Sequence, residues 1–133
     1  MAVKETTIEI KLQNLKSNFK FLKSKINTDT KFMAVVKAFS YGSDSLIISE
    51  ELEKNGVDYL AVAYVREGIS LRKGGIKIPI LVLHPQEEDF NDIINYSLEP
   101  SIYSFRVLNL FFKSLSEKNI KKYPYQIKFN SGL

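Results

Sequence analysis

The chain has 133 residues, of which 44% are hydrophobic and 26% are charged, and its formal net charge is +4. This length and composition predict one folded domain or part of one, and exclude a disordered or membrane-spanning chain. The chain has no cysteine, so it can form neither a disulfide nor a thiolate metal site, and a reducing compartment is permitted. Its lysines are scattered along expected helix faces, so the positive charge does not predict nucleic-acid binding.

The expected elements alternate between helices and strands along the chain. Thr7 to Ile10 alternates polar and apolar residues and predicts a half-exposed strand outside the main sheet. An apolar stripe at helical spacing then predicts a first helix, through Leu12, Leu15, Phe19, Leu22 and Ile26. Short apolar runs predict buried strands at residues 32–36, 59–63, 78–83, 98–103 and 125–129. The segments between them predict helices at residues 45–55, 65–73 and 89–96, and one that begins at residue 105.

This alternation predicts an α/β fold with a parallel sheet. A doubly wound open sheet would be complete at this length, whereas an eightfold barrel would be cut near its middle, and periodicity alone does not choose between them. In both architectures the functional edge lies at the carboxyl ends of the strands. Polar or titratable residues that the chain places there are Lys37, Tyr64, His84, Tyr103 and Asn130.

Lys37 is the strongest candidate for chemistry. It follows the apolar run Met33 to Val36 and precedes a turn that contains Tyr41 and Gly42. Partial loss of hydration at the end of an apolar strand favours a neutral, nucleophilic amine suited to Schiff-base formation. The alternative is that Lys37 extends into solvent and Tyr41 only packs.

The segment Ala34–Gly42, which reads A-V-V-K-A-F-S-Y-G, resembles the lysine motif of alanine racemases, which depend on pyridoxal phosphate (PLP). Further stretches match the family in the same register: Ile8–Ile10, Leu60–Ala63, Glu67–Gly68, Leu71–Ile76, Pro79–Leu83 and Lys128–Leu133. The resemblance implies a partial TIM (β/α)8-type barrel with about five parallel βα units at residues 12–133. It also implies that residues 1–11 supply a strand of a β-domain that is otherwise missing from the chain.

The resemblance also implies roles for individual residues. Lys37 matches the catalytic lysine that binds PLP covalently and moves a proton at the substrate Cα. Tyr41 matches the tyrosine that hydrogen-bonds the cofactor phosphate, and Leu83 lies about where a family leucine borders the cofactor ring. Lys128 aligns with a lysine that is carbamylated in some members, but the arginine that it supports would follow Leu133.

Some residues depart from the usual family pattern. Phe39 and Ser40 replace a polar residue and alanine, Ser43-Asp44 replaces His-Gly, and Asn130-Ser131 stands where Asp-Thr is commoner. The first two departures resemble the subset in which the racemase is fused behind a cell-wall peptide ligase of the Mur family.

The function that the resemblance implies is interconversion of L- and D-alanine for peptidoglycan synthesis, in a cytoplasmic homodimer that binds no nucleic acid and no membrane. Family members need a second base, a tyrosine from the partner subunit, and the matching region is absent from these residues. We therefore expect the 133 residues alone to be inactive.

Other classes of function are considered beside this one. A response-regulator-like phosphoacceptor needs carboxylates after the first and third strands, where this chain has Lys37 and His84. Small PLP-homeostasis proteins also carry an early Schiff-base lysine but lack the A-x-x-Y-G continuation. A non-catalytic half-barrel within a ligase-racemase fusion is a further alternative. His84 is the only histidine, so we expect a loop residue there and no metal site.

Overall fold

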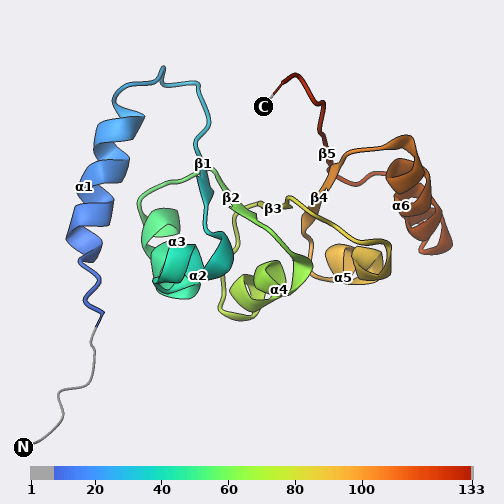
Figure 1. The fold of residues 1–133 in the computed structure, drawn as a ribbon, viewed down its shortest axis with the longest axis horizontal. Helices are drawn as coiled ribbons and strands as arrows, with labels where there is room; N and C mark the ends of the chain where they lie inside the picture. Colours follow the sequence, from blue (N-terminus) through green and yellow to red (C-terminus); the bar gives the residue numbers. More distant parts are fainter. Residues whose placement is uncertain (1–7, 133) are drawn as a thin grey trace, which may run out of the picture.

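The computed structural model describes residues 8–132 and contains one five-stranded parallel sheet. Its strands are β1 (Met33–Val35), β2 (Tyr59–Val62), β3 (Ile80–Val82), β4 (Glu99–Ile102) and β5 (Gln126–Ile127). Each strand pairs with the next one along the chain, in the order β1-β2-β3-β4-β5 (Figure 1). A doubly wound sheet reverses its strand order near the middle, whereas a barrel adds strands in sequence. The partial (β/α)8-type barrel is therefore confirmed, and the doubly wound sheet is excluded.

The connections between the strands are mainly helical, as expected for right-handed βαβ crossovers. The helices are α1 (Leu12–Lys23), α2 (Lys37–Gly42), α3 (Ser45–Lys54), α4 (Val65–Lys73), α5 (Phe90–Asn95) and α6 (Phe105–Glu117), with a 3₁₀ turn η1 (Glu87–Asp89). Figure 1 shows α3, α4 and α5 along one side of the sheet, and α1 beyond β1. Side-chain caps begin two helices, because Asp44 accepts from the N–H of Ile47 and Ser104 from that of Val107.

The two faces of the sheet have different environments. One face packs against the helices and forms the core, with Leu60, Val62, Ile80 and Val82 all fully buried. Register pairs Met33 with Tyr59, Ala61 with Leu81, and Leu81 with Glu99, so these residues share the other face. That face corresponds to the inside of the barrel. There the Tyr59 hydroxyl donates to the buried carboxylate of Glu99, with contacts of 2.8 and 2.9 Å to its two oxygens.

Asp58, just before β2, binds the segment that leads into β1. One oxygen of its carboxylate accepts from the backbone N–H of Phe32 at 2.7 Å and pairs with the Lys23 amine at 3.1 Å. These two contacts hold the pKa of Asp58 below its ordinary value of 3.8, and the Phe32 N–H is the larger cause. Phe32 also packs edge-on against Phe19 of α1, with ring centroids 5.2 Å apart. The first helix is therefore fixed to the edge of the sheet near β1.

The segments before α1 and after β1 have irregular or unusual backbones. Residues 8–11 form no strand, and Thr7, the start of the predicted strand, lies outside the described residues. A strand needs a hydrogen-bonded neighbour, and residues 8–132 provide none for this segment. That residues 1–11 supply a strand of a separate β-domain stays a prediction. The turn expected after Lys37 is present and has a left-handed helical backbone, which is described below. Among the described residues, no helix combines the length and the apolar character needed to cross a bilayer.

Candidate functional site

The segment that follows β1 has an unusual backbone. Ala38, Phe39, Ser40 and Tyr41 have φ of 50–59° and ψ of 40–54°, so four consecutive residues form a left-handed helical turn. None of the four is glycine, and this conformation costs about 1–2 kcal/mol for each such residue. Strain of this kind persists only where the surrounding structure imposes it, and it concentrates at functional sites. The turn is therefore the first indication of a site at this edge of the sheet.

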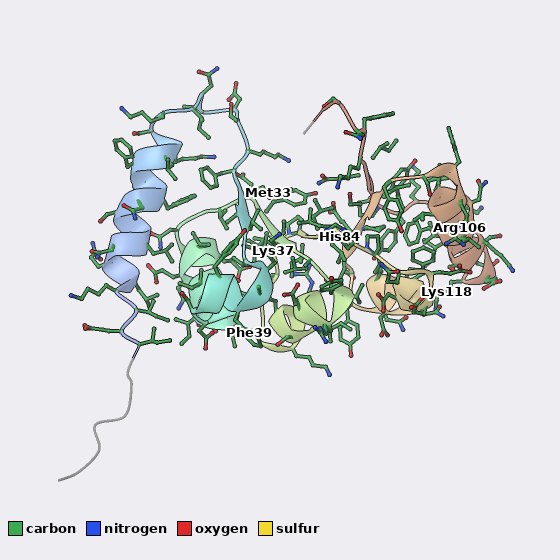
Figure 2. The ribbon with its side chains drawn as sticks, in the orientation of Figure 1. Met33, Lys37, Phe39, His84, Arg106 and Lys118 are labelled. Atoms are coloured by element: carbon green, nitrogen blue, oxygen red, sulfur yellow. The ribbon has the colours of Figure 1, made fainter. Side chains whose placement is uncertain are left out.

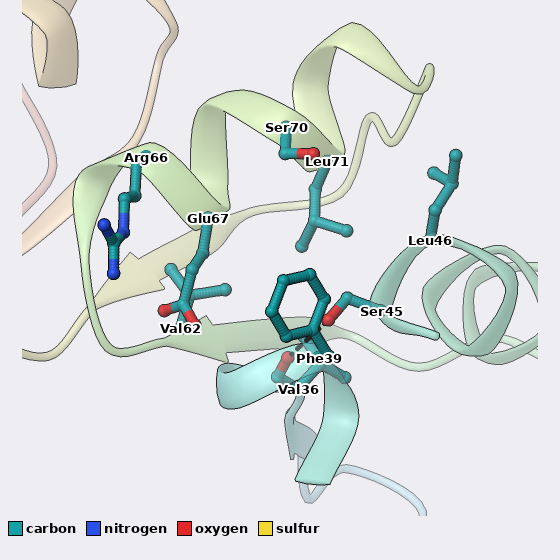
Figure 3. A pocket seen from close by; sticks show the side chains of 9 residues that line it. All are labelled: Val36, Phe39, Ser45, Leu46, Val62, Arg66, Glu67, Ser70 and Leu71. Carbon is teal, nitrogen blue, oxygen red and sulfur yellow. Dashed lines mark hydrogen bonds between the residues drawn. The ribbon is translucent and has the colours of Figure 1, made fainter. Parts of the chain in front are cut away.

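The turn is held by hydrogen bonds from outside itself. Glu67 of α4 accepts from the backbone N–H of Ala38 at 2.7 Å through Oε1. Its other oxygen accepts from the backbone N–H groups of Ala63 and Tyr64 at 2.8 and 3.0 Å. The Ser45 hydroxyl donates to the carbonyl of Val36 at 3.2 Å (Figure 3). One carboxylate thus joins the turn after β1 to the loop after β2.

Lys37 lies where β1 runs into this turn (Figure 2). The preceding residue, Val36, is 2% exposed and belongs to the hydrophobic core, whereas Lys37 itself is half-buried. Among the described residues, no hydrogen bond or ion pair engages the Lys37 amine. A half-buried amine without a carboxylate partner is available to react with a carbonyl group.

A cavity lies at the carboxyl ends of β3, β4 and β5. It has a volume of about 290 Å³ and is lined by Leu83, His84, Tyr103, Lys128 and Asn130. Three of the residues that the sequence placed at the functional edge therefore do meet in space. His84 is exposed, as predicted for a loop residue, and its ring centroid lies 6.2 Å from that of Tyr64.

Tyr41 does not line this cavity. Its side chain is 69% exposed and lies in a separate groove next to α1, together with Phe19, Phe32 and Ser40. The structure therefore places Leu83 and Tyr41 at different hollows of the same edge. Their predicted contacts with PLP remain predictions, as does the role of Lys37. In residues 8–132 no group of three or more His, Asp or Glu side chains could bind a metal ion.

Glu67 is the residue of the site that sequence reasoning did not assign. The signal that points to it is its position, three residues after Tyr64, where a helix-initial glutamate commonly reaches back to the backbone N–H of the N-cap residue. Its second and more distant contact, with Ala38, has no counterpart in local sequence rules because 29 residues separate the two.

Comparison with known proteins explains the combination of a half-barrel and a strand-end lysine. Residues 10–133 match the family model described as alanine racemase, N-terminal domain. The chain belongs to the alanine racemase family. It is 40% identical over 126 residues to an alanine racemase of Clostridium kluyveri, covering 94% of this chain and 32% of that protein. It is 32% identical over 132 residues to alanine racemase 1 of Caldanaerobacter subterraneus subsp. tengcongensis, covering 98% of this chain and 34% of that protein.

Solved alanine racemase structures share the fold. The alanine racemase of Clostridium difficile 630 in complex with cycloserine superposes with a TM-score of 0.84 at 34% identity, covering 91% of this chain and 32% of that one. The chain thus spans about a third of the length of the relatives it matches, and corresponds to their N-terminal part. Neither the PLP-homeostasis protein nor the non-catalytic module is favoured by these matches. Fusion to a Mur-family ligase remains a prediction.

Proposed function

We propose that these residues form the N-terminal part of a PLP-dependent alanine racemase and that Lys37 is its cofactor-binding, catalytic lysine. The observation that carries the proposal is the placement of Lys37. It is a half-buried amine without a partner among the described residues, held at the carboxyl end of β1 by a strained turn. A surface lysine with no special role would not need a turn that costs this much conformational energy.

The chemistry of the proposed residues suits the cofactor, although Tyr41 and Leu83 line different hollows of the same edge. The Lys37 amine suits its aldehyde, and the phenol of Tyr41, 69% exposed, is free to donate to a phosphate. Leu83 offers an apolar side chain at the rim of the cavity that faces the inside of the barrel. When bound, PLP supplies an electron sink for the charge left on Cα after a proton is removed.

The chemistry assigned to Lys37 has two parts. Its amine would hold PLP covalently through the cofactor's aldehyde carbon. With substrate bound to the cofactor, the Lys37 amine would take a proton from the substrate Cα or return one. Alanine is the substrate that we propose for the whole protein.

Racemisation requires a base on each face of Cα, and Lys37 serves only one. We propose that a partner subunit supplies the second, in a homodimer. We accordingly expect residues 1–133 alone to convert L-alanine to D-alanine no faster than a Lys37→Ala variant does. Conversion clearly above that control, measured by chiral chromatography, would contradict the need for a second base.

We also propose that the whole protein supplies D-alanine for peptidoglycan from a cytoplasmic location. What supports this location is the absence of cysteine from the chain, which is compatible with a reducing compartment. Nothing in the described residues offers a basic recognition motif for nucleic acid.

The test is covalent trapping. The protein is mixed with PLP, reduced with borohydride to convert the C=N bond into a stable secondary amine, and digested for peptide mapping by mass spectrometry. The proposal expects one dominant label on Lys37, none in Lys37→Ala, and wild-type labelling of Lys37 in Lys113→Ala, which removes an exposed lysine of α6. Label spread evenly over surface lysines, or absent from Lys37, would refute the role of Lys37.

A further inference from the structure

The carboxylate of Glu67 is placed to control the geometry of Lys37 without touching the reacting atoms. Its three backbone contacts belong to two different loops at the carboxyl edge of the sheet: Ala38 after β1, and Ala63 and Tyr64 after β2. Figure 3 shows the Glu67 side chain pointing from α4 toward the turn α2. Hydrogen bonds from N–H groups to an ionised carboxylate are about twice as strong as neutral ones.

The contact with Ala38 is the one that bears on Lys37. A peptide group is planar, so the N–H of Ala38 and the carbonyl of Lys37 turn together. Fixing that N–H therefore fixes the backbone rotation at Lys37, and with it the direction in which the side chain leaves the strand. Ala38 is also the first of the four residues with positive φ, so the Glu67 contact lies where the left-handed turn begins.

From this geometry we infer that Glu67 is a positioning residue for Lys37: it holds the left-handed turn and thereby aims the Lys37 amine at the aldehyde of PLP. The inference rests on the proposed function of Lys37 and adds a residue 30 positions away to its site. A carboxylate is required because one oxygen must face Ala38 while the other faces two further N–H groups. An amide has only one acceptor oxygen for these three donors.

The chain contains a matched control in Glu53 of α3. One oxygen of Glu53 accepts from the backbone N–H groups of Lys77 and Ile78, both at 2.9 Å. Glu53 thus makes the same kind of contact from a neighbouring helix, but to the segment that enters β3 rather than to a strand end. Removing it costs loop hydrogen bonds without altering the turn next to Lys37.

The experiment compares the rate of PLP labelling at Lys37, trapped with borohydride, in the wild type, Glu67→Ala, Glu67→Gln and Glu53→Ala. Loss of a hydrogen bond to a charged group corresponds to about a tenfold change or more in the population of the held geometry. We expect labelling at Lys37 to slow about tenfold in Glu67→Ala, and less in Glu67→Gln. In Glu53→Ala it should stay within about twofold of wild type.

Two readouts separate positioning from general destabilisation. The midpoint temperature of thermal unfolding should fall in both Glu67→Ala and Glu53→Ala. The backbone amide of Ala38 should exchange its hydrogen with solvent faster only in the Glu67 variants. Labelling of surface lysines serves as an internal reference and should not change. If Glu67→Ala does not fold, the same comparison is made between Glu67→Gln and Glu53→Ala.

The outcomes distinguish this inference from the proposed function. If Lys37 is labelled in the wild type and the folded Glu67 variants label it at the same rate, the positioning role is overturned and the proposed function is left intact. Equal slowing in Glu53→Ala would also overturn it, because stability alone would then explain the loss. Absence of label on Lys37 in the wild type would overturn the proposed function and the inference together.

Discussion

Arg72, near the end of α4, clamps the two loops that lead into β3 and β4. Its Nη1 donates to the carbonyls of Ile76 and Ile78, both at 2.8 Å. Its Nε and Nη2 donate to the carbonyls of Tyr96 and Ser97, both at 3.1 Å. Four backbone acceptors therefore depend on one side chain, and we predict that replacing it destabilises the fold strongly.

The size of the effect follows from the burial of the guanidinium. The guanidinium of Arg72 is part-buried, and this burial lowers its pKa. A hydrogen bond to a charged group contributes about 1.5–3 kcal/mol, but the exposed carbonyl of Ser97 can regain water when Arg72 is removed. We therefore expect Arg72→Met to cost about 3–5 kcal/mol, a large part of the roughly 7–20 kcal/mol typical of a domain this size.

Methionine is the informative replacement because it keeps an unbranched apolar stem and removes the five N–H donors together with the positive charge. Arg72→Lys should recover less than half of the loss, since an ammonium group cannot span four acceptors as a planar fork does. Urea unfolding followed by circular dichroism measures both variants. The control is Arg66→Met on the same helix, an exposed position at which we expect a change within about 0.5 kcal/mol. A loss below about 1 kcal/mol in Arg72→Met, with an unchanged urea slope, would refute the clamp.

Three further predictions concern pH dependence and packing. Burial and the hydrogen bond to Glu99 raise the pKa of Tyr59 from 10 to about 12. The protonated Tyr59 therefore contributes fully to folding stability below pH 10, and this contribution is lost as the pH rises toward 12. The midpoint of urea unfolding should therefore fall less between pH 9 and pH 11.5 in Tyr59→Phe than in the wild type. The N–H of Phe32 lowers the pKa of Asp58, so its contribution is present above about pH 4 and lost as the pH falls through the lowered value. Asp58→Asn should make folding stability depend less on pH in the acid range. A pH midpoint of acid unfolding identical to that of the wild type would argue against this contact. Ser40 has a buried hydroxyl without a partner among the described residues, so Ser40→Ala should raise stability by about 1 kcal/mol, and a lower urea midpoint would contradict this.

Helices with clear sequence boundaries were predicted well. The helix expected at residues 65–73 is observed as Val65–Lys73, ending before Gly74 and Gly75. The helix expected at residues 89–96 is observed as α5 (Phe90–Asn95), but its start continues directly from the unpredicted 3₁₀ turn η1 (Glu87–Asp89), where no side-chain cap fixes the boundary. Local chemistry therefore defines a helix end where a cap or glycine is present and leaves it open elsewhere.

Hydrophobic periodicity predicted the strand positions, whereas the strand order was predicted only through the resemblance to alanine racemases. All five expected runs contain an observed strand, each shorter than predicted because only residues with a paired neighbour are counted. The choice between a barrel and a doubly wound sheet depends on which strands pair, and hydrophobic periodicity describes only which faces are buried. The order β1 to β5 therefore followed from the family resemblance and is confirmed by the structure.

The candidate site was predicted only in part for a similar reason. Lys37 could be singled out because it directly follows a buried strand, a position that can be read locally. The left-handed turn could not, since the sequence Ala-Phe-Ser-Tyr has no residue that favours positive φ. What holds that backbone is a carboxylate from another βα unit, so the conformation is a property of the tertiary structure.

The two ends of α4 perform separate tasks at the two edges of the sheet. Glu67 in its first turn binds N–H groups at the carboxyl edge, where Lys37 lies, and Arg72 in its last turn binds carbonyls at the opposite edge. Acidic residues near a helix start and basic residues near its end are also favoured by the helix dipole. Because the two side chains share no partner, their substitutions should add in stability. The two substitutions should differ in their effect on PLP labelling of Lys37: Glu67→Gln should slow the labelling, and Arg72→Lys should leave its rate unchanged. The same helix would then connect an edge built for stability with an edge built for function.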